Sequence, residues 1–243
     1  MKCKLTGNEG KGIRAHIIPK SFYAIDPEET QPVRLITNAE GHYSRRAPIG
    51  VYDTTIVTED GERIFTEWDD YASELLLDSK TAFEPLAHNG ETVAFQITEY
   101  DYHKLKLFFL SVLWRASASS QHFFRRVKLG PHEESIRNAL LEGNPGDSEW
   151  FSVCLAKWSD HPDGAGMMDP YRTRFDGLNY YVMYLEHYIV YFKVDRRIAS
   201  DAMRAIQLRP ESPLIAVGRE LNGSKELRIM SRMAKAHANG ANK

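Results

Sequence analysis

The stretch RAHIIPKSF, residues 14–22, decides how the first part of this chain is interpreted. It follows a glycine-rich segment and places His16 directly before two isoleucines and a proline. Such a short apolar run is typical of a strand, and a histidine on a strand can face a reacting group. From this stretch alone, His16 could equally be a structural residue that satisfies a hydrogen bond. The residues around the stretch help to separate these two interpretations.

Two turns, one on either side of the stretch, have the spacing of a zinc knuckle. The first, CKLT, begins at Cys3 and ends at Thr6, and the second, TEDG, begins at Thr58 and ends at Gly61. A structural zinc site needs four ligands in a tetrahedron, usually cysteine or histidine, and here only Cys3 supplies a thiol. We therefore expect no structural zinc, and we expect packing to hold this unit together instead.

The segment after the second turn is predicted to form a helix from about Glu62 to Leu77. Its apolar residues recur every three or four positions, which marks one face of an amphipathic helix. These residues are Ile64, Trp68, Tyr71, Leu75 and Leu76. The acids between them, Glu67, Asp69 and Asp70, are expected on the solvent-exposed face. The run GVYDTTIV, which precedes the second turn, is typical of a strand.

Taken in order, four stretches resemble the motifs of the HNH, or ββα-metal, endonucleases. They are CKLT, AHIIPKSFY, GVYDTTIVTEDGERIF and WDDYASELL, and the resemblance covers residues 1–80. The chain is similar to a branch of this family that carries an HIIPK strand. In this chain, however, most of the knuckle cysteines of that branch are lost. The resemblance implies an N-terminal unit of two strands and a helix that hydrolyses phosphodiester bonds of DNA.

The resemblance also assigns roles to three residues. His16 corresponds to the general base, which takes a proton from the water that attacks phosphorus. Asp53 corresponds to the residue that orients the loop or the base, and Glu62 corresponds to a metal ligand at the start of the helix. With Asp53 as a second ligand, such an oxygen-rich site favours Mg²⁺ or Mn²⁺ over zinc.

Nucleic acid is the partner that the resemblance implies, DNA more than RNA. The side chains expected to contact it are Arg14, Lys20, Arg45 and Arg46, since cationic groups bind phosphates. Each of these basic patches has the alternative interpretation of an ordinary solvated face. Bacterial relatives of this kind occur in phage-defence and mobile-element settings, which also suggests an operon-encoded protein partner.

Departures from the family pattern favour a second interpretation. Ala15 stands where many members carry a metal ligand, and most knuckle thiols are missing. In this alternative the chain is a catalytically degenerate relative that binds nucleic acid, or regulates a partner, without cutting. Asp53 is then a strand-edge residue, and Glu62 is an acid favoured by the helix dipole. A third alternative is an unrelated α+β interaction domain.

The remainder, residues 81–243, is predicted to form an α+β portion packed on the first unit, so the fold class is α+β. The run from Leu105 to Trp114 is apolar nearly all round, which indicates a central buried helix. Aromatic and β-branched runs between Phe151 and Val194 predict an antiparallel sheet. The basic, polar tail after Leu227 is expected to fray.

Composition limits the class of protein. Hydrophobic residues make up 42% of the 243 residues and the net charge is -2, so no global basic field indicates non-specific coating of nucleic acid. Two cysteines cannot form a disulfide framework. The longest apolar run, LFFLSVLW, is far shorter than the roughly 20 residues that span a bilayer, and no signal peptide is visible. We therefore expect a cytoplasmic protein without a membrane partner.

Overall fold

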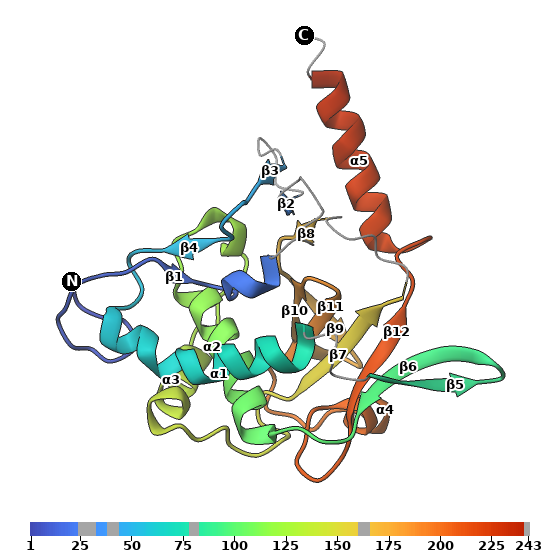
Figure 1. Cartoon of the computed structure of the whole chain (residues 1–243), viewed down its shortest axis with the longest axis horizontal. Coiled ribbons are helices and arrows are strands. Elements are labelled where there is room, and N and C mark those ends of the chain that lie inside the picture. Colours follow the sequence, from blue (N-terminus) through green and yellow to red (C-terminus); the bar gives the residue numbers. More distant parts are fainter. Residues whose placement is uncertain (24–32, 38–43, 78–82, 160–165, 241–243) are drawn as a thin grey trace.

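The computed structural model describes residues 1–23, 33–37, 44–77, 83–159 and 166–240. It confirms an α+β fold, in which helices lie beside several sheets rather than alternating with parallel strands (Figure 1). No helix in these ranges combines the length and the apolar character needed to cross a membrane.

The N-terminal elements are two short paired strands followed by a helix. Strand β1, Ala15–His16, pairs antiparallel with β4, Tyr52–Asp53, so that Ala15 lies opposite Asp53 and His16 lies opposite Tyr52. Helix α1, Glu59–Leu77, follows β4 and begins a little earlier than predicted. Glu59, Asp60 and Glu62 occupy its first turn, where the helix dipole favours acids.

A second small sheet joins the two halves of the chain. It has the strand order β3-β2-β8, with β3 at Arg45–Arg46, β2 at Arg34–Ile36 and β8 at Met167–Met168. Strands β2 and β3 come from the segment between β1 and β4, whereas β8 comes from the loop after β7. The segment inserted between β1 and β4 is therefore anchored on the C-terminal half.

Two further helices, α2 and α3, pack against each other, and α2 also packs against α1. Helix α2, Tyr102–Ala118, is buried along nearly its whole length, as predicted for the Leu105–Trp114 run. Its N-cap Asp101 accepts a hydrogen bond from the backbone amide of Lys104. Helix α3, His132–Glu142, ends at Gly143, whose φ of 60° is the left-handed conformation that glycine adopts most easily.

The large sheet has seven strands in the order β5-β6-β12-β7-β11-β10-β9. The strands are β5 Glu84–His88, β6 Glu91–Ile97, β7 Val153–Trp158, β9 Tyr171–Phe175, β10 Leu178–Leu185, β11 Tyr188–Lys193 and β12 Leu214–Arg219. In the order β7, β11, β10 and β9, each strand is antiparallel to the next, which confirms the predicted antiparallel sheet. Strand β12 then pairs parallel with β7 and antiparallel with β6, so the sheet continues beyond the predicted region.

The C-terminal tail, predicted from its polarity to fray, is helical in the structure as far as Gly240. Helix α4, Asp201–Ile206, precedes β12, and α5, Lys225–Gly240, follows it and extends away from the large sheet (Figure 1). The first turn of α5 is anchored by Glu226, which is buried, accepts a hydrogen bond from the Tyr184 hydroxyl and pairs with Arg219. Sequence polarity alone did not reveal this buried carboxylate.

One cluster of buried side chains includes residues from both predicted portions, from Leu5 and Phe65 to Phe192 and Leu214. The hydroxyl of Tyr188 on β11 donates to the backbone carbonyl of Leu76 at the end of α1. The predicted boundary at residue 80 lies outside the described residues. In the described part, the ββα elements and the large sheet therefore share one core.

Candidate functional site

His16 lies half-buried on β1 with a defined tautomer. Its Nε2 atom is 2.7 Å from the carbonyl oxygen of Ile49, and its ring meets the Tyr52 ring edge-on. A carbonyl oxygen only accepts hydrogen bonds, so in neutral His16 the proton is on Nε2. The free lone pair is then on Nδ1, which is the atom that could act as a base.

Asp53 is 1% exposed, and both of its oxygens are fully engaged. Oδ1 accepts from the amide and the hydroxyl of Thr55, at 2.8 and 2.7 Å. Oδ2 accepts from the Ser119 hydroxyl, the Ser120 amide and the Ser120 hydroxyl, at 3.0, 2.7 and 2.8 Å. Burial raises the pKa of this carboxyl, but the donors on Thr55 and Ser120 outweigh burial and hold its pKa well below the usual range. Asp53 thus fastens β4 to the end of α2.

Arg115 on α2, with no exposed surface, links three elements. Its two terminal nitrogens donate to the two oxygens of Asp69 on α1, at 2.8 and 2.7 Å. Nη1 also donates to the backbone carbonyl of His16 at 2.9 Å, and Nη2 donates to the Ser111 hydroxyl. Arg115 therefore holds the candidate base strand and the helix against α2 through a bidentate, charge-assisted pair.

The prediction that Asp69 lies on the solvated face of α1 was wrong, because its side chain is only 16% exposed. The sequence did contain a signal for its burial. Asp69 lies four positions after Phe65 and three before Ala72, and both of those residues are completely buried. Burial raises the pKa of Asp69, and the neighbouring Arg115 opposes this increase. Glu67, by contrast, is 68% exposed, as expected.

Glu62 lies in the first turn of α1, close enough to Arg115 and Asp69 to be affected by their charges. Its Oε2 atom is buried and has no hydrogen-bond partner among the described residues. Burial raises the pKa of Glu62; the charge of Arg115 opposes the increase and that of Asp69 adds to it. Glu62 thus carries a buried carboxylate oxygen without a hydrogen-bond partner in the part of the chain that is described.

The residues in this region do not fit the predicted divalent ion. Mg²⁺ and Mn²⁺ require several oxygen ligands in a near-octahedral arrangement. The oxygens of Asp53 are engaged by Thr55 and two serines, and those of Asp69 are held by Arg115. Glu62 alone remains, and the described residues contain no cluster of three or more histidine, cysteine or acidic side chains able to hold a metal.

The four knuckle positions do come together in space. Cys3 is buried, and its Sγ accepts from the amide of Thr6 at 3.4 Å. Burial raises the pKa of this thiol, but hydrogen bonds from Thr6 and Thr58 outweigh burial and lower it. A Cβ atom placed on Gly61 would lie 2.7 Å from Cys3 Sγ. The two turns thus meet at one thiol packed against a glycine.

The predicted nucleic-acid contacts lie at two places on the surface. The guanidinium of Arg14 lies over the Tyr52 ring, 5.4 Å from its centre, and Lys20 is exposed nearby in sequence at the start of a short 3₁₀ helix. Arg45 and Arg46 are exposed and form β3.

Further arginines lie around the β3-β2-β8 sheet, close to Arg45 and Arg46 of β3. Arg34 on β2 is exposed and lies directly opposite Arg46. Next to β8, the buried carboxylate of Asp169 accepts from the Thr37 hydroxyl at 2.9 Å and pairs with Arg125 and Arg126 at 3.5 and 3.6 Å. We call Arg34, Arg45, Arg46, Arg125 and Arg126 the arginine surface.

No protein-family model, no curated protein and no solved structure matches this chain. The functional interpretation therefore rests on the residues and contacts described above.

Proposed function

We propose that this chain binds nucleic acid, duplex DNA by preference, through an HNH-like ββα unit that no longer performs metal-dependent cleavage. The observation that carries the proposal is the position of Arg115, whose buried guanidinium pairs with Asp69 and acts electrostatically on Glu62. A permanent positive charge is thus already present among the acids that a divalent cation would need. A second, divalent charge at the same acids would be repelled by it.

The ββα arrangement supports the family likeness on which this proposal rests. The AHIIPK stretch contains β1, the strand that carries Asp53 pairs with β1, and the helix that contains Glu62 follows. Arg115 and Asp53 supply the cross-links that hold these elements, because Arg115 joins β1 to α1 and Asp53 joins β4 to α2. Side-chain pairs thereby take over the stabilising role that metals have in such small units.

The arginine surface supports binding to a phosphate backbone. Arg34 on β2 and Arg46 on β3 lie directly opposite each other, so two cationic side chains come from neighbouring strands. A chain with a net charge of -2 that gathers five arginines around one small sheet has a local, rather than a global, affinity for polyanions.

Two observations favour a second candidate, an active nuclease of the same type. The Ile49 carbonyl fixes the His16 tautomer with a free Nδ1, as a general base requires. The unpartnered Oε2 of Glu62 is an oxygen that a cation could use after a local rearrangement. This candidate needs at least two more oxygen ligands than the described acids leave free.

Fluorescence anisotropy with a labelled duplex tests the proposal. We expect affinity to fall with salt, with a slope that decreases by about 1 for each phosphate-contacting arginine removed. Arg34→Ala and Arg45→Ala should each lower that slope, whereas Arg209→Ala, an exposed arginine before β12, should leave it unchanged. Binding that is absent at low salt, or equally affected by all three variants, would contradict the proposal.

A further inference from the structure

A cavity of about 450 Å³ lies outside the ββα unit and has no role in the proposed function. It opens between the start of α3, the turn that precedes β7 and the segment that follows β11. Its volume is within the range of small-molecule sites. His132, Trp150, Phe151, Lys193, Arg196 and Ile198 are among the residues that line it.

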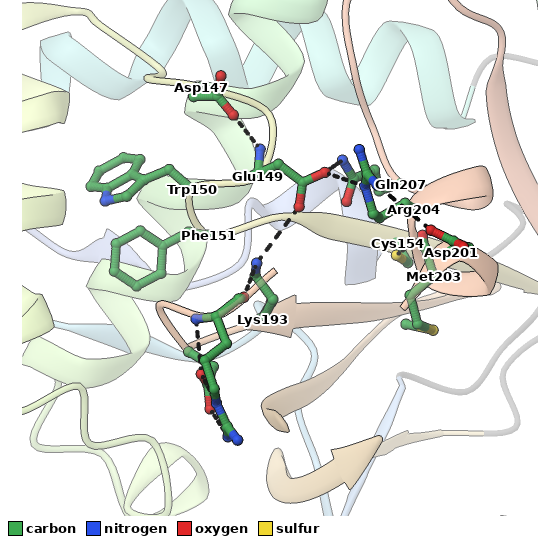
Figure 2. Close-up of polar contacts among 12 residues, drawn as sticks. Asp147, Glu149, Trp150, Phe151, Cys154, Lys193, Asp201, Met203, Arg204 and Gln207 are labelled. Atoms are coloured by element: carbon green, nitrogen blue, oxygen red, sulfur yellow. Dashed lines mark hydrogen bonds and ion pairs between the residues drawn. The ribbon is translucent and has the colours of Figure 1, made fainter. Parts of the chain in front are cut away.

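One side of the cavity is aromatic. The rings of Trp150 and Phe151 lie together with their centres 4.5 Å apart (Figure 2). The His132 ring meets the Phe151 ring edge-on, with 5.3 Å between the centres. Trp150 is half-buried, and Ile198 has 70% of its surface exposed. Partly exposed aromatic and aliphatic groups of this kind can pack against a flat ring.

The aromatic wall is held in a fixed and uncommon conformation. Phe151 has a φ of 44°, which is rare for a bulky side chain and is maintained only where the surroundings impose it. Lys106 on α2 imposes it, since its Nζ donates to the carbonyls of Trp150 and Phe151 at 2.9 and 2.7 Å. The wall is therefore preformed.

Three acids, Asp147, Glu149 and Asp195, also line the cavity, and each has partners within the protein. Asp147 Oδ1 accepts from the backbone amide of Glu149 at 2.7 Å. Glu149 Oε1 accepts from Arg204 and Gln207, and Figure 2 shows its carboxylate between that pair and Lys193. Asp195 is held by Arg197. Arg196, in contrast, is exposed and has no ion-pair partner in the part of the chain that is described. Arg196 is therefore a lining cation that remains available to an anion.

Two buried ammonium groups lie behind the cavity. Lys106 has no exposed surface and donates only to neutral carbonyls. Lys193, with a side chain that is 1% exposed, donates to the Arg197 carbonyl and lies 3.8 Å from Glu149 Oε2. Burial lowers the pKa of Lys106 to about 7, because its charge has little compensation.

We propose that this cavity binds a small anion that joins a flat aromatic ring to a phosphate or carboxylate, the ring against Trp150 and the anionic group towards Arg196. A nucleoside monophosphate has this chemistry, whether it is free in solution or forms the end of a strand. Aromatic carboxylates are smaller molecules that also join a flat ring to an anionic group. The proposal does not depend on the function of the ββα unit.

Tryptophan fluorescence offers a direct readout, because Trp150 is half-buried while Trp68, Trp114 and Trp158 are buried. Titration with adenosine monophosphate or indoleacetate should change the emission saturably, and adenosine alone or inorganic phosphate alone should bind more weakly. Arg196→Ala should weaken binding of adenosine monophosphate about tenfold, the effect of losing one charge-assisted hydrogen bond. Arg172→Ala, an exposed arginine on β9, is the charge-matched control and should have no effect.

Calorimetric titration of Trp150→Phe separates loss of the signal from loss of the site, since this variant keeps a ring at the wall. It should still bind adenosine monophosphate. The proposal is overturned if neither ring-bearing anion binds saturably, or if Arg196→Ala and Arg172→Ala have the same affinity as the parent. An oligonucleotide with a terminal phosphate is then tested as a competitor of adenosine monophosphate. Competition would assign the site to the ends of nucleic-acid strands, and no competition would assign it to the free nucleotide.

Discussion

Replacing Arg115 by methionine tests the proposed role of the buried cation in the ββα unit. Methionine approximates the length of the side chain but removes the charge and every donor. Asp69 would then be a buried carboxylate without its two hydrogen bonds, and the His16 carbonyl would lose a donor at 2.9 Å. Breaking one partner of a buried pair typically costs about 3–5 kcal/mol. That is a large fraction of the roughly 5–15 kcal/mol by which domains are stable.

The second half of this prediction is that removing both partners costs less than the two single changes together. Arg115→Met with Asp69→Leu leaves no unpaired charge, so we expect a coupling free energy of at least about 2 kcal/mol between the two positions. The pair Lys104–Glu67 is a matched control, because it also joins α2 to α1 but its side chains are 36% and 68% exposed. Its removal should cost less than about 1 kcal/mol.

Urea unfolding followed by tryptophan emission measures all of these variants, since Trp68 and Trp114 are buried close to the pair in sequence. If Arg115→Met costs no more than Glu67→Gln, the buried arginine does not hold the unit together. The same conclusion follows if the double variant is as unstable as the sum of the single ones.

Two further predictions concern the acids of the site. Because the pKa of Asp53 is lowered on folding, its ionised form stabilises the protein above its unfolded pKa of about 4, and this stabilisation is lost as the pH falls. Asp53→Asn should therefore lower the free energy of unfolding by about 2–4 kcal/mol at neutral pH, and the difference from the parent should shrink in acid; a constant difference would contradict the assignment. The pKa of Glu62 is raised on folding, so the sign is opposite: its contribution to stability is fully present below its unfolded pKa of about 4.3 and is lost as the pH rises. Glu62→Gln should thus stabilise the protein at neutral pH but not in acid, as measured by urea unfolding across this range, and a loss of stability at neutral pH would refute the interpretation.

The parts of the fold that were predictable are those set by local patterns. The apolar run of α2 and the spacing of Trp68, Leu75 and Leu76 in α1 specify buried faces without reference to the rest of the chain. The aromatic and β-branched runs of β7, β10 and β11 likewise specify strands. The parallel pairing of β12 with β7 joins segments that are distant in sequence, so no local pattern predicts it.

The candidate site was predictable in position but not in chemistry. The motif order predicted His16 opposite Asp53, whereas in the structure Ala15 lies opposite Asp53 and His16 lies opposite Tyr52. The helix follows this strand pair, as the motif order predicted. The partners that define what the acids do are remote in sequence: Arg115 is 46 positions from Asp69, and Ser120 is 67 positions from Asp53. A sequence pattern can identify an acidic residue as a candidate ligand. Only the fold shows whether the oxygens of that residue already have hydrogen-bond partners.

The central claim, binding without metal-dependent cleavage, is tested most directly by assaying both activities on one preparation. Supercoiled plasmid is incubated with the protein in Mn²⁺, in Mg²⁺ and in a chelator, and nicking is measured alongside retention of the same DNA. We predict retention that is the same in all three conditions and that is reduced in Arg34→Ala, with no nicking above the protein-free rate. Mn²⁺-dependent nicking that disappears in a folded His16→Ala variant would contradict the account and establish the active nuclease instead.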